Sequence, residues 1–211
     1  YTTMSFDAEA HIVRELGKFL KEGSLYRGYK PVLWSTVEKT ALADAEVEYL
    51  EHTSDTIYTS FPVKYSNNKN LLNSEVIIWT TTPWTIPANK ALAYNKKLKY
   101  LIIKAESQID FKDRKIVVAK DLLNSFIEEC KITKYQQISE FLGSDFIGTI
   151  CSHPFLNLGY DYDVPMLDAR FVTTEQGTGI VHCAPSHGPD DFNLCLSNGI
   201  KALEKVDDDG K

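Results

Sequence analysis

Apolar residues recur at helical spacing near the start of the chain, in the stretch SFDAEAHIVRELGKFLKEG. Ser5 or Asp7 can cap the first turn, and Gly23 can end the helix. The pattern therefore predicts one amphipathic helix. Five side chains make its apolar face: Ile12, Val13, Leu16, Phe19 and Leu20.

Strand-like stretches dominate the middle of the chain. Four of them are rich in β-branched and aromatic residues and are bounded by turn residues: TIYTSFPVKY, SEVIIWTT, KKLKYLIIKA and RKIVVAK. The later stretch GYDYDVPMLDARFVTTEQGTGIVHCAP predicts two strands joined by TEQGTG, with Gly177 and Gly179 as turn residues. The stretch ALADAEVEYLEH begins with helix-forming residues and then alternates, so its state is ambiguous.

Three further stretches predict short helices. DLLNSFIEEC begins with Asp121 as a cap, and QISEFLGSDFIG suggests another helix. SHGPDDFNLCLSNG has Pro189 at the first helical position and Gly199 as the stop. Many short strands with a few helices predict a β-rich α+β fold. We expect a closed, barrel-like sheet of about six strands with peripheral helices.

Composition and charge exclude several classes of protein. The chain has 211 residues, of which 43% are hydrophobic, and its net charge is −6. A globular core is expected, whereas a stand-alone nucleic-acid binder would be basic. No apolar run reaches the ~20 residues of a membrane span, and no signal peptide is recognisable, so a cytoplasmic location is expected. Four cysteines without CxxC spacing argue against zinc fingers and redox pairs.

Two stretches concentrate residues that can do chemistry. WTTTPWTIPAN, residues 79–89, places three threonines between two tryptophans. GTGIVHCAPSHGPDDF, residues 177–192, contains two histidines, a cysteine and two aspartates. A purely structural explanation exists for the first stretch, since threonine favours strands, proline ends them and tryptophan fills cores.

Three kinds of site fit these residue types. A metal site would use His182, His187 and an aspartate, but Pro185 keeps the histidines off one helix face. A thiol nucleophile would use Cys183 with a histidine base, but neighbours on a strand point to opposite faces. The third kind is a polar pocket in which a carboxylate holds a cationic amine and hydroxyls order a water. Only this pocket accounts for the threonines.

Together the two stretches closely resemble the editing domain inserted into isoleucyl-tRNA synthetases. LYRGYKPVLWS and TALADAEVEY resemble the segments that connect this insert to the nucleotide-binding core, so the resemblance runs from about residue 1 to residue 211. It implies that residues 1–45 are a connecting segment and that residues 46–211 are the editing body. Both ends of the chain then look cut from a longer protein. Many family members carry a CxxC-like pair near Ser35, Thr36 and Lys39; its absence here removes any indication of zinc.

The resemblance implies hydrolysis of mischarged valyl-tRNA(Ile), with valyl-adenylate as a second substrate. HIGH and KMSKS motifs are missing, so ATP would be used only by an aminoacylation domain outside this chain. Asp191 would hold the α-ammonium of valine, although a carboxylate there also simply favours a helix N-terminus. His182 would form a wall that excludes isoleucine; without the resemblance it reads as a core histidine.

Thr80, Thr81 and Thr82 would aim the water and stabilise the oxyanion. Alternation on a strand puts Thr80 and Thr82 on one face and Thr81 on the other. The resemblance assigns five further residues to the binding site or its loop: Trp79, Pro83, Trp84, His187 and Gly188.

Editing of this kind needs no metal and no cofactor. The implied partners are the 3′-terminal aminoacyl-adenosine of tRNA(Ile), its valine moiety and the rest of the synthetase chain, with the fragment itself a monomer. Two alternatives stay open. One is a non-catalytic module that docks the tRNA 3′ end, and the other is a thiol hydrolase centred on Cys183.

Overall fold

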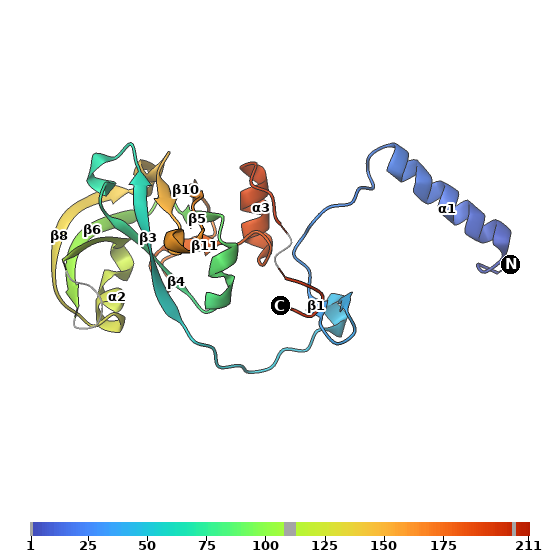
Figure 1. Ribbon diagram of the computed structural model, residues 1–211, viewed down its shortest axis with the longest axis horizontal. Coiled ribbons are helices and arrows are strands. Elements are labelled where there is room, and N and C mark those ends of the chain that lie inside the picture. Colours follow the sequence, from blue (N-terminus) through green and yellow to red (C-terminus); the bar gives the residue numbers. More distant parts are fainter. Residues whose placement is uncertain (1, 108–112, 204–205) are drawn as a thin grey trace.

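The computed structural model describes residues 2–107, 113–203 and 206–211. Its body is one mixed sheet of nine strands, in the order β11-β5-β10-β9-β3-β4-β7-β6-β8 (Figure 1). The β10–β5 and β4–β7 neighbours are parallel, and the other pairs are antiparallel. The strands of the body are β3 (Ile57–Tyr65), β4 (Glu75–Thr80), β5 (Ala91–Tyr94), β6 (Lys99–Ser107), β7 (Arg114–Ala119), β8 (Ile132–Leu142), β9 (Ile150–Ser152), β10 (Asp163–Asp168) and β11 (Ile180–Cys183).

The sheet is larger than the sequence predicts. About six strands are expected from the sequence, and nine are present because β5, β8 and β9 also join the sheet. The two strands expected around TEQGTG exist as β10 and β11, but β5 lies between them. Within the described residues, β11 and β8 end the hydrogen-bonded row and no pairing joins them. Closure into a barrel therefore stays a prediction.

The sheet nevertheless curls so that the turn before β11 contacts the far strands. The backbone N–H of Ala119, at the end of β7, donates to the carbonyl of Thr178 at 2.8 Å. The buried Tyr100 hydroxyl of β6 donates to the carbonyl of Gly179, also at 2.8 Å. Gly177 and Gly179 have φ values of 78° and 73°, which explains why this turn needs glycine. The second motif is thereby fixed against the core.

Two short helices cover the body. α3 (Pro189–Ser197) begins at Pro189 as the sequence predicts, and Gly199 after it has a φ of 74°. α2 (Leu123–Glu129) is also present, but Leu122 occupies the N-cap position. The prediction that Asp121 caps this helix was wrong, because Asp121 lies inside the 3₁₀ helix η4 (Lys120–Leu122) that precedes α2.

The helix expected from QISEFLGSDFIG was also wrong. The first half of this stretch belongs to β8, which pairs with β6 along its length, and only η5 (Gly143–Phe146) is helical. Pairing with a neighbouring strand overrides the local preference of these residues. The remaining short 3₁₀ helices are η1 (Asp44–Glu46), η2 (Lys69–Leu71), η3 (Pro83–Ala88) and η6 (Leu156–Leu158).

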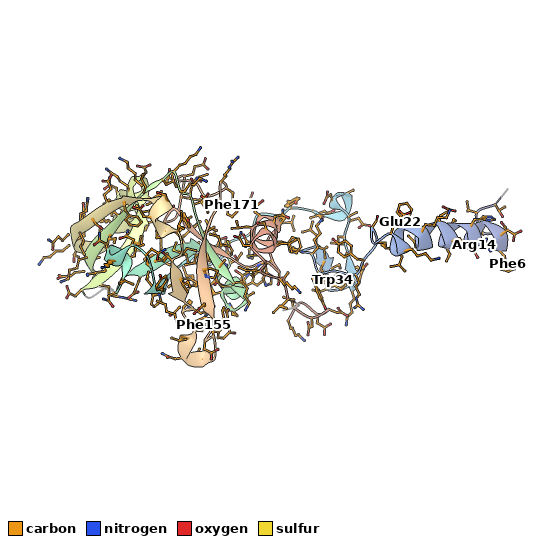
Figure 2. All side chains as sticks on the ribbon, turned by 90° about the horizontal axis from the view of Figure 1, so that it is seen from above. Phe6, Arg14, Glu22, Trp34, Phe155 and Phe171 are labelled. Carbon is orange, nitrogen blue, oxygen red and sulfur yellow. The ribbon has the colours of Figure 1, made fainter. Side chains whose placement is uncertain are left out.

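The N-terminal segment stands apart from the body. α1 (Phe6–Lys21) has Ser5 as its N-cap, as predicted, and no buried residue (Figure 2). Its expected apolar face exists but is open to solvent, with side chains between 53% and 67% exposed. Residues 47–56 form an extended connection before β3. The proposed division at residues 45 and 46 stays a prediction. No helix in the described ranges is long and apolar enough to cross a membrane.

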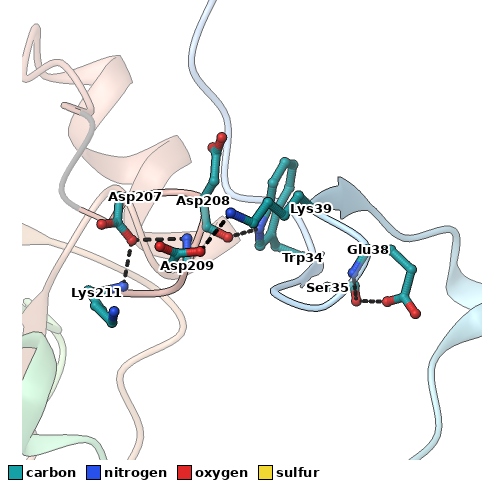
Figure 3. A network of polar contacts seen from close by, with 8 residues as sticks. All are labelled: Trp34, Ser35, Glu38, Lys39, Asp207, Asp208, Asp209 and Lys211. Carbon is teal, nitrogen blue, oxygen red and sulfur yellow. Dashed lines mark hydrogen bonds and ion pairs between the residues drawn. The ribbon is translucent and has the colours of Figure 1, made fainter.

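A small clasp joins two segments that are far apart in sequence, residues 34–39 and 207–211. The first contains the hairpin strand β1 (Trp34–Ser35), which pairs with β2 (Thr40–Ala41). The indole N–H of Trp34 donates to the carbonyl of Asp208 at 3.1 Å (Figure 3). Lys39 and Asp209 form an ion pair at 2.8 Å. The two segments that flank the body therefore meet on its surface.

Candidate functional site

The threonine peptide turns sharply where β4 ends. Thr80 is the last residue of β4, and its hydroxyl accepts the backbone N–H of Thr82 at 3.0 Å. The hydroxyls of Thr80 and Thr82 lie 3.2 Å apart, and Thr81 and Thr82 are both exposed. Because β4 ends at Thr80, this closeness comes from the turn into η3 and not from alternation along a strand. Pro83 then starts η3, which fits its fixed φ.

Thr85 and Asn89 link this peptide to the second motif. The Thr85 hydroxyl lies 2.8 Å from Nε2 of His182, and it donates to the carbonyl of Thr82 at 2.8 Å. The Asn89 amide nitrogen lies 3.2 Å from Nδ1 of the same ring. The sequence alone indicates no role for either residue. In a 3₁₀ helix, side chains three residues apart lie above one another. The spacing of Thr82 and Thr85 could therefore have indicated that Thr85 belongs to the site.

These contacts define the protonation of His182. The amide nitrogen of Asn89 can only donate, so Nδ1 of His182 accepts. The proton of the ring then lies on Nε2, which donates to the Thr85 hydroxyl. Burial, with smaller effects from His187 and His153, lowers the pKa of His182 to about 4. The side chain is therefore a neutral, buried ring held on both sides. Since both nitrogens are engaged by protein groups, His182 offers no lone pair to a metal ion.

Two further side chains contact backbone carbonyls of η3 and of the residue that ends it. His153, which is buried, has Nε2 at 3.0 Å from the carbonyl of Ile86. The Tyr162 hydroxyl donates to the carbonyl of Asn89 at 2.7 Å. No pattern in the sequence indicates a role for His153, and the structure shows that it supports the threonine peptide.

Asp191 lies in the first turn of α3 and is partly buried. Its Oδ2 accepts the backbone N–H of Ala184 at 2.9 Å, which orients the carboxylate. Burial, together with the charge of Asp190, raises the pKa of Asp191. A Cβ at Gly188 would lie 3.2 Å from the Asp191 carboxylate, so glycine there permits this close approach. The groups that act on the Asp191 carboxylate are the Ala184 N–H and Asp190, and neither carries a positive charge.

The aromatic residues of the first motif differ in their surroundings. Trp84 is 65% exposed, and its ring meets His187 edge-on with centroids 5.1 Å apart. Burial lowers the pKa of His187, so this ring is also neutral at pH 7. Trp79 is partly buried, and a Cβ at Gly177 would lie 3.4 Å from its side chain. Trp84 is thus available to a ligand, and Trp79 packs against the glycine turn.

Cys183 lies on the opposite face of β11 from His182, although the charge of Asp191 acts on its thiol. In β11 it pairs with Ala91, next to His182, and it is completely buried in a cluster that includes Cys195. Burial raises the pKa of the Cys183 thiol well above its ordinary value. A thiol nucleophile must ionise, so this environment argues against the thiol-hydrolase alternative.

Comparison with known proteins identifies the family of this chain. Residues 1–163 match the family described as tRNA synthetases class I (I, L, M and V). The chain belongs to the class I tRNA synthetases. It is 76% identical over 211 residues to the isoleucine–tRNA ligase of Pelagibacter ubique and 49% identical over 217 residues to that of Gluconobacter oxydans. Each alignment covers 100% of this chain and 23% of the relative.

Solved structures of class I synthetase segments share the fold. The crystal structure of GlLeuRS-CP1 has a TM-score of 0.50 at 23% identity, covering 68% of this chain and 63% of that one. The P. knowlesi cytosolic leucyl-tRNA synthetase editing domain has a TM-score of 0.51 at 13% identity, covering 68% and 60%. At these identities the likeness concerns the fold: a large mixed sheet with few helices. This synthetase chain spans less than a quarter of the length of the two ligases.

Proposed function

We propose that this chain hydrolyses valyl-tRNA(Ile), and valyl-adenylate as a second substrate, while sparing the isoleucyl ester. The observation that carries the proposal is the contact between Thr85 and His182, because it joins the two motifs at 2.8 Å across 97 residues. Neither motif alone suggests a pocket. Together they supply hydroxyls, a rigid ring and, from helix α3 after β11, a carboxylate.

His182 suits a steric wall better than a general base. A hydrophobic pocket separates valine from isoleucine by only ~1–3 kcal/mol, a limit for which isoleucyl-tRNA synthetases are themselves the standard example. A second site must therefore reject the larger side chain by its shape. A buried ring held by Thr85 and Asn89 cannot easily move aside, and its low pKa keeps it uncharged beside an apolar side chain.

Asp191 provides the charge that an aminoacyl ester requires. The substrate carries a free α-ammonium, which a carboxylate without a protein counter-ion can bind. Thr80, Thr81 and Thr82 provide hydroxyl and backbone N–H groups for a water and for the developing oxyanion. Because threonine is a poor base, we propose that the free ribose hydroxyl of the terminal adenosine assists deprotonation. Replacing that hydroxyl by hydrogen should slow hydrolysis, and an unchanged rate would remove this part of the proposal.

The deciding experiment measures release of valine from valyl-tRNA(Ile) and of isoleucine from isoleucyl-tRNA(Ile). The chain should release valine and spare isoleucine. Asp191→Asn keeps an oxygen for the Ala184 N–H but removes the charge, so it should lose most activity. Asp190→Asn is the matched control, since Asp190 is exposed in the same helical turn.

Binding without hydrolysis would favour a different function. If the chain binds the aminoacylated 3′ end but releases neither amino acid, it is a docking module, and the threonines need a group that this chain lacks. A cytoplasmic location, a monomeric state and contacts with the rest of a synthetase belong to the same proposal.

A further inference from the structure

Two side chains at the ends of neighbouring strands lie against the end of η3. His153 directly follows β9, and Tyr162 directly precedes β10. Ser152 and Asp163 are partners in the pairing of these strands, so His153 and Tyr162 stand opposite each other where the pairing ends. Their ring centroids lie 5.5 Å apart. The two rings therefore form one unit, which the strand pair holds in place.

Each member of this pair donates to one carbonyl at the end of η3. The Phe155 N–H donates to Nδ1 of His153 at 3.1 Å, so the ring proton lies on Nε2 and is donated to the Ile86 carbonyl. Burial lowers the pKa of His153, so the ring is neutral at pH 7. The Tyr162 hydroxyl donates to the carbonyl of Asn89. Burial raises the pKa of Tyr162 to about 12, so this hydroxyl stays protonated.

These two hydrogen bonds hold the backbone of Asn89 on both sides. The carbonyl of Ile86 also accepts the backbone N–H of Asn89 at 3.0 Å, so His153 and Asn89 share one acceptor. Tyr162 holds the carbonyl on the other side of the same residue. The next residue, Lys90, adds a cation–π contact, with Nζ 3.6 Å from the centre of the Tyr162 ring. Groups outside the two motifs thus fix the position of Asn89.

The side chain of Asn89 depends on this hold on its backbone. Its amide nitrogen donates to the carbonyl of Ala91 at 2.9 Å and lies 3.2 Å from Nδ1 of His182. Its Oδ1 is buried and has no hydrogen-bond partner in the described part of the chain. The oxygen adds nothing that would hold the amide, so the amide follows the backbone and its two donated bonds. A shift of the Asn89 backbone would therefore reach the His182 ring.

We propose that His153 and Tyr162 are positioning residues that set the discrimination between valyl and isoleucyl esters. They act through Asn89, whose amide fixes the rotation of the His182 ring. This inference rests on the proposed function, in which that ring is the wall against isoleucine. Both residues act at a distance, since the N–H and the hydroxyl that they donate are bonded to carbonyls of η3 and its last residue.

Tyr162→Phe is the mildest test, because it removes one hydroxyl and keeps the ring. The ratio of kcat/KM for valyl-tRNA(Ile) to kcat/KM for isoleucyl-tRNA(Ile) should fall roughly 3-fold to 10-fold, the scale of one lost hydrogen bond. The change should come from faster hydrolysis of the isoleucyl ester, with the KM of the valyl ester unchanged. Tyr160→Phe is the matched control, since Tyr160 stacks on the same His153 ring at 4.7 Å and phenylalanine preserves that contact.

A pair of variants tests His153. His153→Gln keeps an N–H donor for the Ile86 carbonyl and should retain most of the discrimination, whereas His153→Leu removes the donor and should lose it. If His153→Leu does not fold, Tyr162→Phe decides alone. The proposal is overturned if Tyr162→Phe discriminates as well as Tyr160→Phe does, or if folded His153→Leu discriminates as well as His153→Gln.

Nitrogen NMR of the His182 ring gives a second measurement, which needs no hydrolysis. Tyr162→Phe is used here, because His153 itself acts on the pKa of His182 through its charge. In this variant Nδ1 should lose its amide donor, so its resonance should move toward that of a free acceptor and the pKa of His182 should rise. If wild type hydrolyses neither ester, the proposed function fails, yet a His182 signal altered by Tyr162→Phe and not by Tyr160→Phe still supports the positioning of this ring. An unaltered His182 signal in Tyr162→Phe overturns it.

Discussion

Nε2 of His182 lies 2.8 Å from the hydroxyl of Thr85, although 97 residues separate them in the chain. The same hydroxyl donates a hydrogen bond to the carbonyl of Thr82, so the ring is linked to the backbone of the threonine peptide. Any change at Thr85 therefore acts on His182 and on η3 together.

Replacing Thr85 by valine keeps the shape of the side chain and removes the hydroxyl. The buried Nε2–H of His182 then loses its acceptor, which should lower the free energy of unfolding by about 1–3 kcal/mol. Urea unfolding measures this loss. Thr85→Ser keeps the hydroxyl and should lose less. If Thr85→Val is as stable as Thr85→Ser, the hydrogen bond contributes little. Because the His182 ring is then held less firmly, Thr85→Val should also hydrolyse the isoleucyl ester faster relative to the valyl ester.

The low pKa of His182 predicts a loss of stability in mild acid. In the unfolded chain this histidine gains a proton near pH 6.5, whereas in the folded chain it resists until about pH 4. The unfolded state therefore binds more protons between these values, and stability falls as the pH drops through this window. The contribution is about 3 kcal/mol. Unfolding at pH 7.5 and pH 5 should differ less in His182→Gln than in wild type. Equal differences would contradict a depressed pKa.

The raised pKa of Asp191 predicts the acid limit of hydrolysis. A protonated Asp191 cannot hold an ammonium group, so the rate should fall as the pH drops, starting above the ordinary range of an aspartate. The charge of Asp190 contributes to that shift. Asp190→Asn should therefore move the acid limb of the pH–rate profile to lower pH without abolishing activity. If the acid limb lies at the same pH in Asp190→Asn and in wild type, a group other than Asp191 sets it.

Cys183→Ala separates the two hydrolytic mechanisms. We expect hydrolysis to persist, because the thiol is buried in the core and is held protonated. Stability should fall by roughly 1–2 kcal/mol from the lost packing. Cys195→Ala is the matched control, since Cys195 is buried in the same cluster. An inactive Cys183→Ala beside an active Cys195→Ala would restore the thiol mechanism.

Elements with a strong local signal could be predicted from the sequence. α1 and α3 have caps, helical periodicity or a leading proline, and the turn at Gly177 and Gly179 has glycines where φ is positive. β5 could not be predicted from alternation, because all four of its residues are buried between β11 and β10. β8 depends on its pairing with β6, which no local pattern shows.

The candidate site divides in the same way. Alternation predicts that Thr80 and Thr82 lie close together, and they do, although β4 ends at Thr80 and the turn into η3 brings them together. Thr85 and Asn89 could not, since their contacts with His182 depend on how η3 leaves β4 and on how β11 reaches it. His153 supports η3 through a carbonyl, and such a contact leaves no pattern in the side chains.

The clasp closes a loop that contains the whole sheet, because 174 residues separate Trp34 from Asp208. In a disordered chain, joining such distant points costs closure entropy, which rises slowly, by about 0.6 kcal/mol for each doubling of length. The folded sheet removes most of that disorder beforehand. The clasp should therefore form after the sheet and open before it. Its Lys39–Asp209 ion pair is largely exposed, so added salt should release the two flanking segments while the sheet stays folded.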